Sequence, residues 1–254
     1  MQKVTFLLFL IPLLSFSQWT QIGQGIGGEA ASDISGVGVS LNSNGSILAI
    51  SATNNDGNGI SSGHVRVYEN LSGVWTQIGN DIDGEAAGDF SGSIGLNSNG
   101  NVIAIGAKWN DGNGVDSGHV RVFENLSDVW TQIGNDINGE AAGDSSGGSI
   151  SLNSNGNVVA IGAFLNDGNG IDSGHVRVYE NLSGVWIQIG NDIDGENPED
   201  RFGHSVSLSS VGNIVAIGSI ANDDNGIDSG HVRVYENLSG VWTQIGNDIA
   251  GEEA

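Results

Sequence analysis

The residues with the clearest capacity for chemistry are acidic and amide side chains that recur in glycine-rich segments. Carboxylate and amide oxygens on a glycine-flexed loop are the donors that Ca²⁺ prefers. The pattern Asp-x-Asn-x-x-Asp therefore predicts candidate calcium ligands. Asp, Asn and Gly are also ordinary loop formers, whose side chains bond their own backbone, and this alternative stays open. The candidate ligands are Asp111, Asn113 and Asp116, then Asp167, Asn169 and Asp172, then Asp223, Asn225 and Asp228.

Histidine, arginine and tryptophan recur with a common period. No second His or Cys follows each His closely enough to complete a metal set, so we expect each His to make a structural hydrogen bond. The Arg two positions later should pair with a carboxylate, and each Trp should pack between strands. An active site needs a set of different residues around one cleft, whereas these copies are alike, so we expect the protein not to be an enzyme. The histidines are His64, His119, His175 and His231.

Composition narrows the class of partner. The chain of 254 residues has 30 acidic residues against seven Lys and Arg, which gives a net charge of −23. Such a charge repels nucleic acid and anionic lipid surfaces, so we exclude nucleic acid as a partner. The chain has 42 Gly, two Pro and no Cys. Short Val- and Ile-rich runs between Gly, Asn, Asp and Ser clusters indicate an all-β protein with many turns.

The N-terminal segment, residues 1–17, predicts a secretory signal peptide. Lys3 supplies a positive charge, Val4 to Leu14 an apolar run, and Ser15 to Ser17 small residues before Gln18. This arrangement is typical of a cleaved signal, and the apolar run is shorter than the ~20 residues that a membrane span needs. We therefore expect residues 18–254 to be secreted or on the cell surface, without membrane insertion after cleavage.

The chain repeats itself with a period of about 56 residues, a size typical of propellers and other repeat architectures. Each copy contains four strand-like runs, which in the fourth copy are 203–208, 213–218, 231–235 and 241–246. Four antiparallel strands per unit, repeated radially, predict a β-propeller; a solenoid would have shorter coils. We expect blades at about 27–82, 83–137, 138–193 and 194–249, an extra strand at 19–26, and a place within a larger ring. The repeated GHVRV segments begin at Gly63, Gly118, Gly174 and Gly230.

The placement of the loops follows from this topology. In an up-and-down blade, the connections after the second and fourth strands emerge on the same side. The candidate calcium loops follow the second strand, and Glu85, Asp89, Glu140, Asp144, Glu196 and Asp200 follow the fourth. One side of the propeller should therefore be strongly acidic.

The fourth copy resembles an FG-GAP repeat. It contains Phe202-Gly203, the segment SVSLSS, and a strand that ends in Ile217-Gly218-Ser219. This family includes the propeller of integrin alpha subunits and many secreted bacterial proteins, among them flavobacterial repeat proteins. Its calcium loop, of the form DxDxDGxxD, lies between the first two strands. Here that connection is only NSNGN or SSVGN, too short to surround a cation, so the family's calcium site does not carry over.

These observations lead to an expected function. The chain should be an exported, non-enzymatic β-propeller scaffold for adhesion to, or recognition of, an extracellular protein or glycan, with calcium as a possible stabilising ion. A propeller-type carbohydrate-active enzyme and a purely structural spacer remain as alternatives. The ligand and the number of blades in the intact ring do not follow from the sequence.

Overall fold

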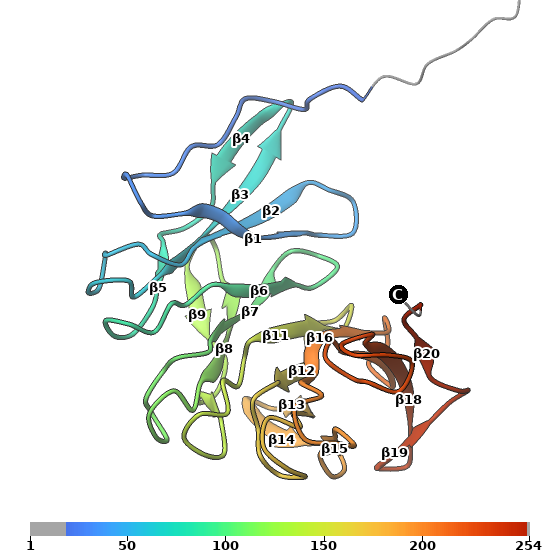
Figure 1. Cartoon of the computed structure of the whole chain (residues 1–254). Coiled ribbons are helices and arrows are strands. Elements are labelled where there is room, and N and C mark those ends of the chain that lie inside the picture. Colours follow the sequence, from blue (N-terminus) through green and yellow to red (C-terminus); the bar gives the residue numbers. More distant parts are fainter. Residues whose placement is uncertain (1–18, 253–254) are drawn as a thin grey trace, which may run out of the picture.

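The computed structural model describes residues 19–252, and every regular element within this range is a β-strand. The predicted signal peptide at 1–17 lies outside the described residues. Each repeat forms one antiparallel sheet, which we call a blade, and the four blades follow one another around an arc (Figure 1). The prediction of an all-β propeller is confirmed.

The first two blades have the same strand order. In both, the first strand lies at the inner edge and pairs with the second, the second with the third, and the third with two outer strands. Blade 1 consists of β1 (Ser35–Leu41), β2 (Ile47–Ala52), β3 (His64–Leu71), β4 (Val74–Gln77) and β5 (Ile82–Asp83). Blade 2 consists of β6 (Ser93–Leu96), β7 (Val102–Ala107), β8 (His119–Asn125), β9 (Trp130–Gln132) and β10 (Ile137–Asn138).

The last two blades repeat this order. Their inner strands continue the row begun by β1 and β6, since β6 contacts the inner strand of blade 3, which contacts that of blade 4. Blade 3 consists of β11 (Ser149–Leu152), β12 (Val158–Ala163), β13 (His175–Leu182), β14 (Val185–Gln188) and β15 (Ile193–Asp194). Blade 4 consists of β16 (Phe202–Leu208), β17 (Ile214–Ser219), β18 (His231–Leu238), β19 (Val241–Gln244) and β20 (Ile249–Ala250).

The outer edge of each blade consists of two short strands, where the sequence predicts a single fourth run, 241–246 in the last copy; the structure ends that run earlier and adds a second strand after it. In blade 2, β9 ends at Gln132 and β10 begins at Ile137. Gly134 between them has a φ of 73°, which interrupts extended backbone and favours glycine. A Cβ on Gly134 would also lie 2.5 Å from the carbonyl oxygen of Gly184 in the next blade. The Gln132 side chain spans the break with a 2.7 Å hydrogen bond to Asp136.

Three apolar cores hold the arc together, and each lies between two consecutive blades. The core between blades 3 and 4 joins Val176 and Val178 of β13 to Val215 and Ile217 of β17. The other two cores join blades 1 and 2 and blades 2 and 3 in the same way. The sheet of each blade has two apolar faces. A blade can bury both faces only by packing against the blades on either side of it.

A tryptophan hydrogen bond marks each junction, and it explains the residues before blade 1. The indole N–H of Trp186 donates to the carbonyl of Ile133 in the preceding blade, at 2.8 Å. Trp75 makes the equivalent 3.0 Å bond to Ile22, in the N-terminal segment. Residues 19–29 thus follow the path of a preceding blade's outer strand. The strand expected at 19–26 is not formed. An outer strand pairs with the third strand of its own blade, whereas residues 22–24 contact blade 1 through side-chain hydrogen bonds.

The packing predicts that the same substitution at equivalent positions of blades 3 and 4 lowers the free energy of unfolding by different amounts. Val178 is 1% exposed in the core between blades 3 and 4, whereas its counterpart Val234 in blade 4 is half-buried. Val178→Ala should lower the free energy of unfolding by about 2 kcal/mol, through lost burial and a residual cavity. Val234→Ala should have a clearly smaller effect. Urea unfolding of both variants checks this, and equal losses would contradict the assignment of the cores to the junctions.

Candidate functional site

The candidate calcium loops are held by hydrogen bonds of their own. In the β7–β8 loop, Asp111 Oδ1 accepts the backbone N–H of Asp116 at 2.9 Å. The Asn113 amide turns away and donates to the carbonyls of Gly139 and Glu140 at 2.8 and 3.1 Å. Each loop thus brings its two aspartates together, while its asparagine ties the loop to the connection after the outer strand. The next loop repeats these contacts at Asp167, Asn169 and Asp172. In the last loop Asp223 accepts from Asp228 in the same way, and Asn225 donates to the carbonyl of Gly251.

These contacts place the loops after the second strands and the connections after the outer strands on the same side of the propeller. The expected acidic surface is nevertheless smaller than the sequence indicates, because one carboxylate in each repeat is buried. Asp89 is 3% exposed and accepts hydrogen bonds from the Ala86 N–H and the Asn110 amide, at 3.1 and 3.0 Å. Asp144 and Asp200 are buried in the same way. These aspartates tie the connection before each inner strand to the long loop of the same blade, and they are not available to a ligand at the surface.

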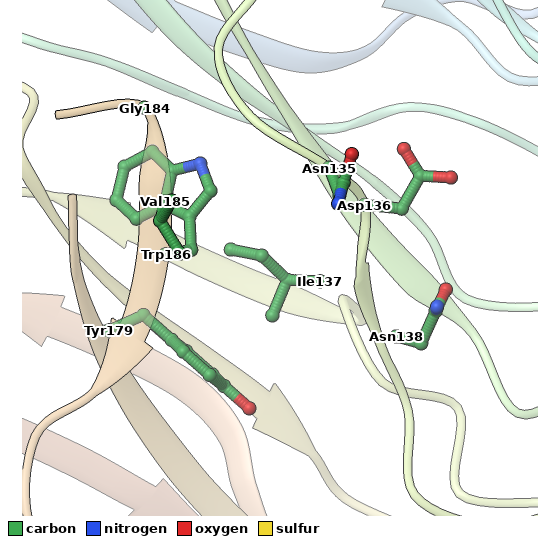
Figure 2. Close-up of a pocket in the computed structure, with 8 residues that line it drawn as sticks. All are labelled: Asn135, Asp136, Ile137, Asn138, Tyr179, Gly184, Val185 and Trp186. Atoms are coloured by element: carbon green, nitrogen blue, oxygen red, sulfur yellow. The ribbon is translucent and has the colours of Figure 1, made fainter. Parts of the chain in front are cut away.

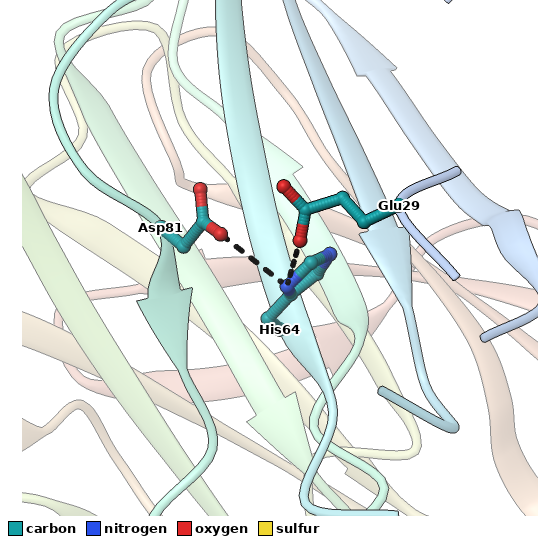
Figure 3. Close-up of side chains that lie close together, drawn as sticks. All are labelled: Glu29, His64 and Asp81. Carbon is teal, nitrogen blue, oxygen red and sulfur yellow. Dashed lines mark ion pairs between the residues drawn. The ribbon is translucent and has the colours of Figure 1, made fainter. Parts of the chain in front are cut away.

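A second constellation, which the sequence analysis missed, surrounds each repeated histidine. In blade 1, His64 Nδ1 lies 3.9 Å from Glu29 and 3.7 Å from Asp81 (Figure 3). The histidine is 2% exposed. It makes no side-chain hydrogen bond within residues 19–252, so the expected structural hydrogen bond is not found. Equivalent groups are Glu85, His119 and Asp136, and Glu140, His175 and Asp192. In blade 4 the group is Asp224, His231 and Asp248, in which Asp224 of the β17–β18 loop takes the place of the glutamate.

Burial sets the electrostatics of these groups. Desolvation, together with the charge of the neighbouring Arg177, lowers the pKa of His175 to about 4. The pKa of His119 is lowered by burial and by its own neighbouring arginine. Burial raises the pKa of Glu85 and Glu140, against the opposing effect of the nearby arginines. At neutral pH these two histidines are therefore uncharged and keep a nitrogen lone pair for a ligand.

Each group could hold a metal ion, since one ligand atom from each residue lies within 4.8 Å of the others. A neutral imidazole with two carboxylates suits zinc or a similar transition metal better than calcium, which takes only oxygen ligands. An arginine competes for the same glutamate, as Arg121 lies 3.7 Å from Glu85. That contact confirms the expected pairing of the repeated arginines with carboxylates.

The groups draw on segments that are distant in sequence, which is why the sequence analysis missed them. A search for a second His or Cys next to each histidine finds nothing. The available signal was a constant offset, because the aspartate follows the histidine at the same spacing in all four groups, from His64 to Asp81 as from His231 to Asp248.

A groove lies between neighbouring blades at their outer edge. Between blades 2 and 3 it has a volume of about 340 Å³. Tyr179 and Trp186 lie on one side of Ile137, and Asn135, Asp136 and Asn138 on the other (Figure 2). An equivalent groove of about 290 Å³ lies between blades 1 and 2, lined by Asn80, Asp81, Phe123 and Trp130 among others.

The fold and its repeated junctions define the class: the chain is a β-propeller repeat protein. Residues 194–235 match the model of the FG-GAP repeat family, which agrees with the resemblance at Phe202-Gly203. A search of curated protein sequences finds no match to this chain. No helix within residues 19–252 is long and apolar enough to span a membrane.

Solved structures share this architecture. A candidate 6-phosphogluconolactonase from Bacteroides uniformis is similar with a TM-score of 0.57 at 12% identity, over 85% of this chain and 55% of that one. A candidate 6-phosphogluconolactonase from Bacteroides fragilis has a TM-score of 0.56 at 15% identity, over 85% of this chain and 55% of that one. The periplasmic gluconolactonase of Pseudomonas aeruginosa has a TM-score of 0.57 at 15% identity, over 85% of this chain and 57% of that one. This chain thus spans little more than half the length of these proteins, and likeness at such identity concerns the fold.

The neighbours correct one expectation. The likeness of the repeats led us to expect that the protein is not an enzyme. Proteins named as lactonases share the architecture, so that expectation is wrong. A propeller places different chemistries on one scaffold, and function is decided by the site.

The buried histidines predict a pH dependence of stability. The unfolded chain binds a proton at His175 below about pH 6.5, whereas the folded chain binds it only near the lowered pKa of about 4. The free energy of unfolding should therefore fall as the pH drops through this window. His175→Asn should flatten that slope by at most about 1.4 kcal/mol per pH unit.

The measurement is urea unfolding between pH 7 and 4 in a chelator, with His204→Gln, an exposed histidine, as the control. Glu85 and Glu140 contribute with the opposite sign, because their pKa values are raised; comparing the variant with the wild type isolates the histidine. An unchanged slope in His175→Asn would contradict the account.

Proposed function

We propose that the protein is a secreted or cell-surface scaffold that recognises an extracellular glycan through the grooves between its blades. The N-terminal signal pattern and the FG-GAP match support export, since repeats of this family are typical of extracellular proteins. The net charge of −23 disfavours an anionic ligand. A neutral glycan is therefore favoured over an acidic one.

The observation that carries this proposal is the composition of the repeated grooves. A sugar-binding groove combines aromatic surface for the apolar face of the ring with a few polar groups for its hydroxyls. Tyr179 and Trp186 supply the first, and Asn135, Asp136 and Asn138 the second. Asn135 makes no side-chain hydrogen bond within the described part of the chain, so its amide is free to bind a ligand. Two such grooves side by side give a repetitive ligand two points of attachment.

We expect loss of glycan binding when the amides of the grooves are removed. The double variant Asn80→Ala, Asn135→Ala should weaken binding on a glycan array by at least about tenfold, the effect of ~1.4 kcal/mol. Asn247→Ala is the matched control, read at a concentration where the chain is monomeric, because this asparagine has the same place in blade 4, which no following blade covers within residues 19–252. The array is also analysed for cleaved glycan.

Each outcome decides between functions. Binding that depends on Asn80 and Asn135 supports the glycan scaffold. Release of cleaved product would instead identify a carbohydrate-active enzyme. Binding to an immobilised extracellular protein without any glycan would favour protein recognition, and the absence of saturable binding to either would leave a structural spacer.

We further propose that calcium binds the acidic loops at Asp111, Asn113 and Asp116 and at the two equivalent sets. One oxygen of Asp111 bonds the loop backbone, and its other oxygen and the Asp116 carboxylate, which is exposed, are left for a cation. Binding would relieve repulsion among the loop carboxylates of a strongly acidic protein.

Calcium should then raise the stability of the folded chain. At a hundred times its Kd, an ion bound only by the folded state adds about 2.7 kcal/mol per site. The triple variant Asp111→Asn, Asp167→Asn, Asp223→Asn should lose this increment in thermal unfolding, while Glu85→Gln should retain it. An unchanged Tm between excess calcium and chelator would exclude the proposal. If only Glu85→Gln lost the stability increment, the calcium site would be assigned to the histidine groups and not to the loops.

A further inference from the structure

The three internal junctions share one set of backbone hydrogen bonds. At the junction of blades 3 and 4, the N–H groups of Glu199, Arg201 and Phe202 donate to the carbonyls of Ile171, Asp172 and Ser173, at 2.7, 3.0 and 3.0 Å. The junctions of blades 1 and 2 and of blades 2 and 3 have the same three bonds, at 2.9 to 3.1 Å. The residues just before each inner strand thus attach to the long loop of the preceding blade.

The side of blade 4 that faces away from blade 3 has this attachment site without an occupant. The carbonyls of Ile227, Asp228 and Ser229 correspond to the three acceptors, and they receive no such bond within residues 19–252. Beside them lies a recess of about 350 Å³. We call it the terminal recess; its lining includes Ser205, Gly218, Gly230, His231, Val232 and Ile249.

The same position in blade 3 shows what fits the terminal recess. There it is filled by Phe202, whose backbone, with that of Gly203, packs against Gly174 and Gly162. In blades 1 and 2 the same position is filled by Ser91 and Ser146, each 1% exposed, whose backbone packs against Gly63 and Gly118, so the serine that blade 1 carries there, Ser35, also fits. Filling it also buries an isoleucine of the outer strand. Ile193 of blade 3 is 5% exposed, whereas its counterpart Ile249 of blade 4 is 62% exposed.

Blade 1 presents the complementary surface. The N–H groups of Ser32, Ile34 and Ser35 correspond to the three donors, and they make no such bond to a loop within the described residues. Gly36, in the place of Gly203, has no atom within 4 Å of where its Cβ would lie. Leu41 is 57% exposed, whereas its counterpart Leu152 is 9% exposed.

We propose that a second copy of this chain docks the inner strand of its blade 1 into the terminal recess of the first, head to tail. One chain carries both halves of an interface that its own junctions show three times. The arc spans 55 to 57% of the length of the propeller neighbours, so it corresponds to an open part of such a ring. Two arcs come to 110 to 114% of that length, so a closed dimer would be a slightly wider ring than theirs. A dimer would contain four blades from each copy, which is within the range of ~4 to 8 blades found in propellers.

Two features set the strength of this association. The charge of −23 on each copy opposes contact, so association should strengthen with added salt, which screens the repulsion. The segment 19–29 already occupies the outer part of the blade 1 face, through the Trp75 bond to Ile22. It competes there with residues 242–252 of the other copy, so removal of residues 19–29 should strengthen association.

The test is sedimentation velocity of residues 18–254 over a wide concentration range at moderate salt. We expect a concentration-dependent dimer in the wild type. Ile249→Lys, in the terminal recess, and Leu41→Lys, on blade 1, should each weaken it by at least about tenfold. Both residues are exposed, so folding should be retained, which circular dichroism checks. Val211→Lys, 69% exposed and in the β16–β17 turn, is the control and should associate like the wild type.

Mixing the two variants gives the sharpest result. Ile249→Lys keeps an intact blade 1 and Leu41→Lys keeps an intact recess, so an equimolar mixture should form one good junction and recover a dimer. A wild type that stays monomeric at every concentration would overturn the proposal, and so would a mixture that stays monomeric. Equal weakening in Val211→Lys would overturn it as well. None of these outcomes depends on glycan binding, which uses the grooves between internal blades.

Discussion

The structure depends on one constraint: a repeat of this sequence makes a single sheet with two apolar faces, and a sheet cannot bury both faces by itself. Each of the three cores lies between two blades and takes its residues from both. Stability is therefore a property of junctions more than of repeats. The residues that are nearly invariant from copy to copy lie where one blade meets the next, which includes the tryptophans, the arginines and the glycines of close approach.

The same constraint places the candidate sites. The first three histidine groups combine a glutamate that precedes the inner strand with a histidine and an aspartate of the blade that follows. The grooves need Tyr179 and Trp186 from one blade and Asn135 to Asn138 from another. Any function at these sites requires assembled neighbours. It also depends on the order of the blades, because the last blade lacks a following partner within the described chain.

The sequence predicts most of the fold and less of the sites. The period, the alternation of Val232 and Val234 and the Asn-Gly turns are local signals, and they led to antiparallel blades. The break at Gly134 was missed because its cause, the approach of Gly184 from the next blade, is not local. Asp89 was assigned to the acidic surface, since a sequence does not show that the Asn110 amide buries it. The group of Glu85, His119 and Asp136 was missed because its members meet only across a junction.

Amide hydrogen exchange of the monomeric chain tests the central claim most directly, because blades of nearly identical sequence differ in their neighbours. Backbone amides of β8 and β13 lie between two blades, and those of β18 have a neighbour on one side only. If burial at the junctions stabilises the repeats, β18 should exchange clearly faster than β8 and β13. Equal protection of the three strands would show that each repeat is stable by itself, and would contradict the account.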